Sequence, residues 1–180
     1  MIPDNELLRQ RLEAWSTDMA DLRLPLWQEL PPLDLYMDQV LLLLKQYLAP
    51  LLREQGEKAV TASIINNYVR MKVMPPPVKK KYARTHLAYL IIICSLKQSL
   101  SIASIRELLP AETEEDTVRQ FYDDFVSLFR TVSNSMIQLT RSEAEVSLLR
   151  AGHPAAAAAI AAVLTKSLTE QLLAVEEQEQ

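Results

Sequence analysis

Residues 61–87 read TASIINNYVRMKVMPPPVKKKYARTHL, and this succession of helix, break and helix decides the expected fold. Thr61 or Ser63 can cap a helix that runs to about residue 72, with its apolar side chains on one face. The three prolines that follow end this helix, because proline lacks a backbone N–H and clashes with the preceding turn. Three lysines come next, and a second helix is predicted at 84–98. The stretch therefore predicts a helix–turn–helix with a short, lysine-rich wing.

Proline or glycine also separates the helices predicted elsewhere in the chain. Asp4 and Asp34 are suitable caps for helices that end near residues 19 and 53, although Pro50 can kink the second of these or end it early. Ser101 caps a helix that Pro110 closes. Acidic residues after Thr113 suit the start of a long helix, and an alanine-rich helix follows it. Only two glycines occur in 180 residues, which argues against a fold built from β-hairpins. The sequence predicts an all-α winged helix–turn–helix protein with an additional N-terminal helix and a C-terminal helical region. The expected divisions are 1–33 (helix and proline-rich connector), 34–110 (winged helix–turn–helix) and 111–180 (assembly or sensing region).

Charge is distributed unevenly along the chain. Residues 58–106 contain nine Lys or Arg and no Asp or Glu, whereas the protein as a whole has 19 basic and 23 acidic residues. The other 131 residues therefore hold ten basic and 23 acidic side chains. A segment of 49 residues without a carboxylate, in a chain that is otherwise acidic, indicates a surface that faces a polyanion.

Several classes of function are not expected from this composition. Cys94 is the single cysteine, so no intramolecular disulfide can form, which suits a cytoplasmic protein. The apolar runs fall short of the roughly 20 residues that cross a bilayer, and the polar N-terminus does not resemble a signal peptide. His86 and His153 lack the spaced partners of a metal site, and glycine-rich phosphate loops are absent. We expect no metal, no cofactor and no enzymatic activity.

The helix, the wing and the start of the following helix supply the candidate contacts to DNA. Asparagine can pair with adenine through two hydrogen bonds, and lysines and tyrosines suit the sugar–phosphate backbone. Basic residues at the start of a helix oppose its dipole, so Arg84 is not explained by helix stability. The predicted DNA-binding residues are Ser63, Asn66, Asn67, Tyr68, Arg70, Lys72, Lys79, Lys80, Lys81, Tyr82, Arg84 and His86.

The long helix that begins after Thr113 carries apolar residues at heptad spacing. Such a pattern favours helix pairing, although Ser135 and Ser142 interrupt it. We expect a homodimer with an interface that includes Val118, Phe121, Phe125, Leu128, Val132 and Leu139.

The motifs of residues 64–109 resemble the winged-helix domain of MerR-type transcriptional regulators. The similarity lies in IINNYVRMKVMPPP, in KYARTHL and in LSIASIRELL, which correspond to a recognition helix, a wing and the last helix of that domain. The resemblance implies that Tyr68 and Arg70 contact the DNA backbone and that Tyr82 and Arg84 close the wing. Lys72 stands where the pattern has glycine, and the link from Pro77 to Tyr82 is shorter than a typical wing. The effector-binding region of MerR proteins has no counterpart here, so any small-molecule effector is left open.

A closer resemblance covers about residues 24–109. The motif WQELPPLDLYMDQV at 27–40, together with the Asn-Asn-Tyr and Pro-Pro-Pro-Val-Lys-Lys-Lys-Tyr motifs, is similar to domain of unknown function family 1836, an uncharacterised family of Firmicutes. This family has no established activity. The functional expectation, a transcriptional regulator that binds double-stranded DNA, therefore comes from the MerR-like pattern and from the charge.

Three alternatives remain open from the sequence. The winged helix could be retained in a protein-interaction or adaptor module, with its basic surface covered by a partner or by residues 107–180, which hold 13 acidic and five basic side chains. Tyr68 and Tyr82 could equally be core aromatics. A lysine triplet by itself is often only a solvated turn.

Overall fold

The structure, a computed structural model, describes residues 5–52, 60–110, 113–141, 158–166 and 169. Within these ranges the backbone forms helices and two isolated β-bridges but no strand, which confirms the all-α prediction. The chain divides into two compact units. The central unit is Leu22–Phe129, and the terminal unit combines Met1–Asp21 with Arg130–Gln180. Both boundaries expected from the sequence, after residues 33 and 110, fall inside the central unit.

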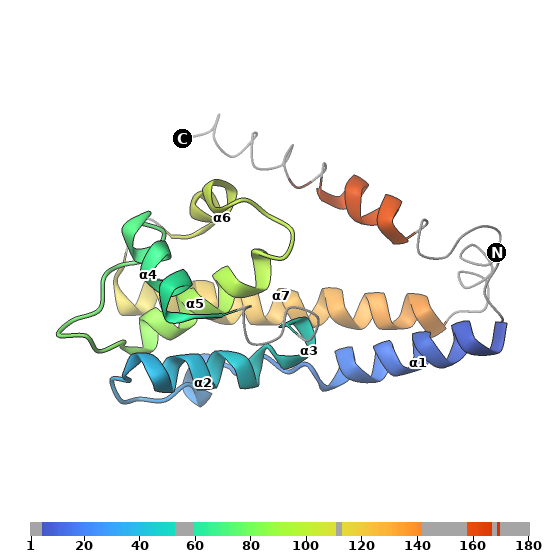
Figure 1. The fold of residues 1–180 in the computed structure, drawn as a ribbon, viewed down its shortest axis with the longest axis horizontal. Coiled ribbons are helices and arrows are strands. Elements are labelled where there is room, and N and C mark those ends of the chain that lie inside the picture. The colour runs from blue at the N-terminus through green and yellow to red at the C-terminus, as the bar shows by residue number, and fades with distance from the viewer. Residues whose placement is uncertain (1–4, 53–59, 111–112, 142–157, 167–168, 170–180) are drawn as a thin grey trace. The chain divides into compact units, whose positions relative to one another are not determined.

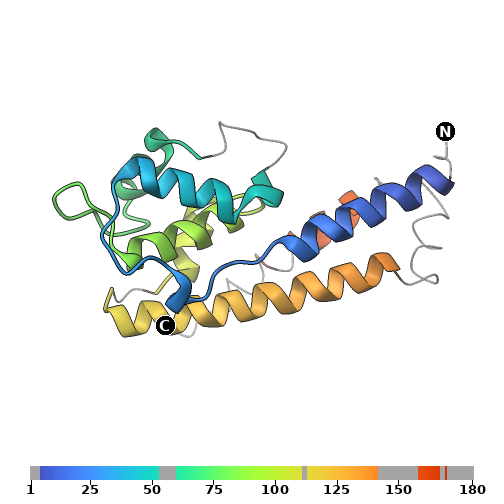
Figure 2. The same cartoon turned by 90° about the horizontal axis from the view of Figure 1, so that it is seen from below.

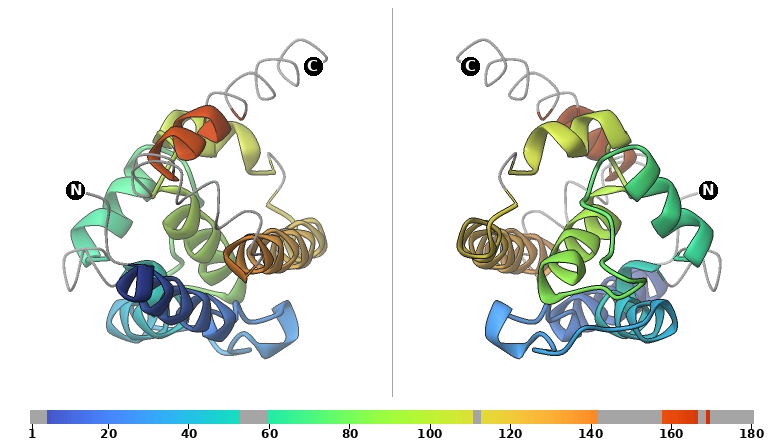
Figure 3. Two further views of the ribbon diagram at one scale, coloured as in Figure 1. Left: turned by 90° about the vertical axis from the view of Figure 1, so that its right-hand side faces the viewer. Right: turned by 90° about the vertical axis from the view of Figure 1, so that its left-hand side faces the viewer.

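The central unit is built around one apolar helix. Its elements are η1 (Trp27–Glu29), α2 (Met37–Tyr47), α3 (Ala49–Leu52), α4 (Ala62–Arg70), α5 (Arg84–Leu96), α6 (Ile102–Leu108) and the first half of α7 (Glu115–Arg141). Helix α5 lies in the middle, with α2, α4, α6 and α7 around it (Figure 3). Every residue from His86 to Ser95 is buried. A helix that is apolar on all sides is accommodated only within a core, which explains the central position of α5.

Two of the predicted helix caps are confirmed. The Thr61 hydroxyl accepts a hydrogen bond from the Ile64 N–H (3.3 Å), and the Ser101 hydroxyl accepts one from the Ser104 N–H (3.1 Å). Each bond satisfies a backbone donor that has no partner within the helix.

The cap expected at Asp34 is not formed. Leu35 is instead held in an extended bridge to Tyr82, so α2 begins only after this bridge. Tyr36 is the N-cap residue, and its N–H donates to the Gln39 side chain at 2.9 Å. Helix α2 also ends earlier than residue 53, at Tyr47, and the short α3 follows it.

Two backbone bridges fix the loop between α4 and α5. Leu35 and Tyr82 exchange both of their N–H···O bonds, at 2.9 and 2.8 Å. Val78 and Lys81 likewise exchange two bonds, at 3.1 and 2.9 Å, which closes a four-residue turn. The loop projects from the body of the central unit (Figures 1 and 2). Where the sequence predicts a short wing, the chain forms a single four-residue turn, and Tyr82, the residue after it, is anchored to Leu35 before α2.

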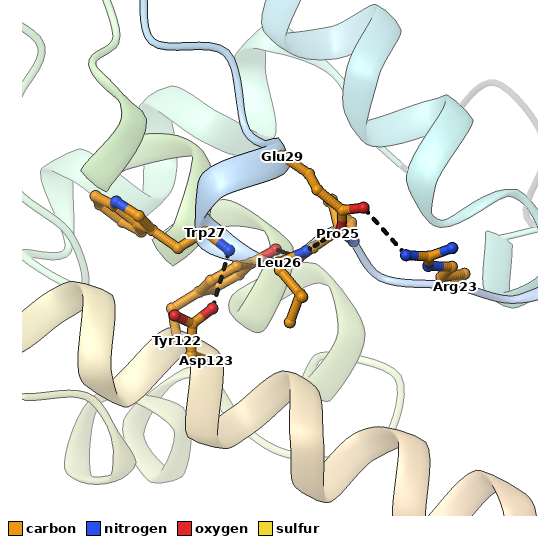
Figure 4. Close-up of polar contacts among 7 residues, drawn as sticks. All are labelled: Arg23, Pro25, Leu26, Trp27, Glu29, Tyr122 and Asp123. Carbon is orange, nitrogen blue, oxygen red and sulfur yellow. Dashed lines mark hydrogen bonds and ion pairs between the residues drawn. The ribbon is translucent and has the colours of Figure 1, made fainter.

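A buried tyrosine of α7 holds the connector that precedes α2. The Tyr122 hydroxyl donates to the Pro25 carbonyl at 2.7 Å, and the Trp27 N–H donates to the Asp123 carboxylate at 2.9 Å (Figure 4). The two aromatic rings meet edge to face, with centroids 6.3 Å apart. Burial raises the pKa of Tyr122 above its ordinary value, and the neighbouring Tyr47 raises it further by a smaller amount. The hydroxyl therefore keeps its proton.

The start of this connector is held by a second polar cluster. The Glu29 carboxylate accepts from the Leu26 N–H at 2.7 Å and pairs with Arg23 at 3.1 Å (Figure 4). Both side chains of this ion pair are substantially exposed, so the backbone bond to Leu26 is the more important of the two interactions.

In the terminal unit, α1 (Asn5–Asp21) runs beside the second half of α7 (Figure 2). Ser16 of α1 and Ile137 of α7 are buried. Residues 158–166, within the predicted alanine-rich helix, are helical. Apart from residue 169, the rest of that helix lies outside the described residues.

Candidate nucleic-acid interface

Helix α4 presents one polar face and one buried face. Ile65 and Tyr68 are buried, at 0 and 6% exposed. Ser63, Asn66 and Arg70, spaced three and four residues apart, are exposed on the opposite side. An α-helix with side chains is about 10–12 Å across, close to the width of the major groove of B-DNA. The exposed face therefore has both the size and the donor and acceptor groups needed to contact base edges.

The two adjacent asparagines of α4 have different surroundings. The Asn67 side-chain oxygen accepts a hydrogen bond from the Arg70 guanidinium at 2.6 Å, and its amide nitrogen lies 3.3 Å from the Met71 sulfur. Asn67 is partly buried, whereas Asn66 is exposed and has no side-chain partner among the residues that the structure describes. Asn67 consequently orients Arg70, and Asn66 is available to a ligand.

Lys72 occupies the position after α4 at which helices often have glycine. Its φ is 57°, in the left-handed region. The Val73 N–H donates to the Tyr68 carbonyl and the Lys72 N–H to the Val69 carbonyl, both at 3.0 Å. This is the Schellman arrangement, whose left-handed residue is usually glycine because a Cβ atom costs free energy there.

Lys79 and Lys80 also have left-handed backbones. They are the central residues of the Val78–Lys81 turn, with φ values of 49° and 64°. Positive φ at both central residues, within a pair of exchanged hydrogen bonds, is typical of a type I′ turn, for which Asn-Gly is strongly preferred. The left-handed conformation costs a residue with a Cβ roughly 1–2 kcal/mol. Lysine at these positions is therefore not explained by backbone geometry.

Each of these three lysines is solvent-exposed. Among the described residues, none of Lys72, Lys79 and Lys80 is within ion-pair distance of a carboxylate. Their charges are thus not neutralised by the described part of the protein. This is the arrangement that an anionic ligand requires.

Two other basic residues have partners within the central unit. The Lys81 ammonium lies 5.5 Å from the centroid of the Tyr36 ring, in cation–π geometry. The Arg84 guanidinium lies 5.5 Å from the centroid of the Trp27 ring, and its Nε–H points to the Pro31 carbonyl at 3.5 Å. Arg84 is partly buried, so it fastens α5 to the connector. Lys81 remains exposed and can also reach a ligand.

Three of the predicted DNA-binding residues are core residues. Tyr68, Tyr82 and His86 are 6, 3 and 6% exposed, so their side chains do not form the outer surface. Burial raises the pKa of Tyr68 to about 12 and that of Tyr82 above its ordinary value, which keeps both hydroxyls protonated. The alternative that both tyrosines are core aromatics agrees with these positions.

His86 links the base of the loop to α5. Its Nδ1 accepts a hydrogen bond from the Ala83 N–H at 3.0 Å, and its Nε2 lies 3.1 Å from the Pro76 carbonyl. A backbone N–H can only donate and a carbonyl can only accept, so these bonds assign the neutral tautomer with its proton on Nε2. Tyr82 packs edge to face against the same ring at 5.8 Å. His86 therefore fixes the shape of the loop.

The candidate dimerisation residues of α7 also differ in exposure. Val118 is 1% exposed and packs within the central unit, so it is not available to a second copy. Phe121 and Phe125 are partly exposed, while Leu128 and Val132 are 63 and 51% exposed. The side chain of Leu139 lies outside the described residues.

One residue of this region, Tyr36, was not predicted from the sequence, because no local pattern marks it as part of the surface. Tyr36 is 54% exposed and lies beside Lys81 because Leu35 pairs with Tyr82, a contact between segments more than 40 residues apart in the chain. Only the long-range pairing brings Tyr36 to the four-residue turn Val78–Lys81, which we call the lysine turn.

Other kinds of site were also sought within the described part of the chain. No group of three or more His, Cys, Asp or Glu side chains is placed to hold a metal ion. No helix there is both long and apolar enough to cross a membrane. Cys94 is buried, and burial raises its pKa to about 12, so its thiol is unreactive at neutral pH.

Comparison with known proteins gives a family but no named relative. No curated protein and no solved structure matches the chain. The family model described as a domain of unknown function (DUF1836) matches residues 25–125, which lie entirely within the central unit and include α4, the lysine turn and α5. This match covers more than half of the chain, and the protein belongs to the DUF1836 family.

Proposed function

We propose that the protein is a cytoplasmic transcriptional regulator that binds double-stranded DNA through the central unit. In this proposal α4 is the recognition helix of a MerR-like winged helix–turn–helix and enters the major groove. The lysine turn acts as a reduced wing and contacts the phosphate backbone. The single observation that carries the proposal is the left-handed conformation of Lys79 and Lys80, two exposed cations at positions where Asn-Gly would be more stable.

Strained residues in native proteins cluster at functional sites, where another requirement outweighs the conformational cost. Lysine contributes a mobile positive charge at the tip of the turn, and asparagine or glycine does not. A ligand with closely spaced negative charges is the partner that benefits from such a tip. The absence of carboxylates from residues 58–106 supports the same partner.

The proposed regulator acts as a homodimer. Two half-sites on DNA are then bound by two copies of α4, as in other helix–turn–helix proteins. The exposed apolar side chains of Leu128 and Val132 on α7 support an interface between copies.

A salt titration tests the proposal. We expect the purified protein to bind a fluorescent random-sequence duplex of about 30 base pairs with an affinity that falls steeply as the salt concentration rises. Each phosphate contact contributes a slope of about 0.9 to the logarithmic plot of affinity against salt concentration. Fluorescence anisotropy between 50 and 300 mM salt measures this slope. Absence of binding at 50 mM salt, or an affinity that does not change with salt, would overturn the proposal.

A further inference from the structure

Asn66 and Asn67 are adjacent residues of the same type on the same helix, and the structure separates their roles. Both polar atoms of the Asn67 amide are engaged, one by the Arg70 guanidinium at 2.6 Å and the other by the Met71 sulfur at 3.3 Å. The amide of Asn66 makes no hydrogen bond with any described residue and is exposed. Asn66 also lies at the middle of the nine-residue helix α4, between Ser63 and Arg70 on its polar face.

We propose that Asn66 reads an adenine in the DNA that α4 contacts, so that the target site includes an A·T pair at this position. This inference rests on the proposed DNA-binding function and names the residue that gives it sequence specificity. A free carboxamide offers one acceptor and one donor side by side, which match the N6 amino group and the N7 atom of adenine in the major groove. A guanine presents two acceptors at the same edge and cannot satisfy both atoms of the amide.

Asn67 has a different role as a positioning residue. A hydrogen bond from a charged guanidinium to an amide oxygen is short and strong, and here it holds Arg70 in one orientation on the polar face. The remaining N–H groups of Arg70 then already point in a fixed direction, so the Arg70 side chain loses less freedom when it binds a ligand. Loss of Asn67 should weaken the contact made by Arg70 while the adenine contact of Asn66 remains.

Selection from a randomised duplex library tests the proposal. The wild-type protein is expected to enrich duplexes with an A·T pair at one position of each half-site. Asn66→Ala should lose this preference, and its ratio of affinity for the enriched duplex to that for random duplex should fall by roughly tenfold. Replacement of that adenine by 7-deazaadenine, which lacks N7, should weaken wild-type binding and leave Asn66→Ala unchanged. Asn66 is exposed within a helix, so alanine is compatible with the fold.

Two further variants make the test specific. Asn67→Ala should still enrich the same A·T pair, and Asn134→Ala, an exposed asparagine of α7, should behave as the wild type. Loss of the A·T preference in Asn67→Ala but not in Asn66→Ala would overturn the assignment. If the wild type binds duplex DNA and enriches no A·T pair, the assignment is wrong and the proposed function stands. If it binds no duplex at all, both are wrong.

Discussion

The double substitution Lys79→Asn, Lys80→Gly is expected to make the protein more stable and to weaken its binding to DNA. Asn-Gly is the preferred sequence of a type I′ turn, so the left-handed cost at both positions is relieved. Part of this gain is offset because glycine gives the unfolded chain more freedom. A net gain of about 1 kcal/mol would raise the melting temperature by about 4 °C for a unit of this size. Thermal unfolding followed by circular dichroism measures the change.

The same substitution removes two positive charges from the proposed phosphate contact. Loss of two contacts should weaken binding to duplex DNA about 30-fold at 0.15 M salt, if each contact contributes the usual counterion release. A matched control is Lys45→Gln, Arg106→Gln, which removes the same charge from exposed positions of α2 and α6. This control should bind nearly as well as the wild type. A variant that is stabilised and still binds with wild-type affinity would show that the lysine turn does not contact DNA.

Replacement of Tyr122 is expected to have the largest effect on stability. Tyr122 is fully buried, packs against Trp27 and donates to Pro25, so it joins α7 to the connector. Tyr122→Ala leaves a cavity and should cost about 3–5 kcal/mol. Tyr122→Phe keeps the ring, leaves the Pro25 carbonyl without its donor and should cost about 1–2 kcal/mol. Chemical denaturation monitored by Trp fluorescence measures both changes.

The exposed residue Leu42 provides the control for this pair of variants. It lies on α2 in the same unit and is 67% exposed, so Leu42→Ala should change the stability of the protein by less than about 0.5 kcal/mol. If Tyr122→Phe were as stable as the wild type, the hydrogen bond to Pro25 would contribute nothing to holding the connector. Equal effects of Tyr122→Ala and Leu42→Ala would contradict the burial of Tyr122 between α7 and the connector.

Local sequence signals were sufficient to predict most of the helices. Thr61 and Ser101 cap helices as expected, because an N-cap depends only on the next three residues. Helix α4 ends before the proline triplet, at Arg70, because Lys72 takes the left-handed conformation of a Schellman arrangement. The prediction of a cap at Asp34 was wrong, because Leu35 pairs with Tyr82, which is distant in the sequence, and α2 begins only after this pair. Sequence patterns do not contain such long-range pairing.

The candidate surface was predictable in its charge but not in its geometry. The carboxylate-free segment identified the lysines, yet nothing in Lys79-Lys80 suggests a type I′ turn, because its usual signal is Asn-Gly. Tyr68 and Tyr82 could not be assigned to surface or core from composition, since tyrosine is suited to both. The difference between Asn66 and Asn67 depends on side-chain contacts with Arg70 and is visible only in the folded helix.

The most direct test of the DNA-binding proposal compares the salt dependence of duplex binding by the wild type and by Lys79→Asn, Lys80→Gly. If both lysines contact phosphates, the slope of log affinity against log salt concentration should become less steep by about 1.8 for the variant. The control Lys45→Gln, Arg106→Gln should keep the wild-type slope. Identical slopes for the wild type and the turn variant would contradict the claim that this turn contacts the phosphate backbone of DNA.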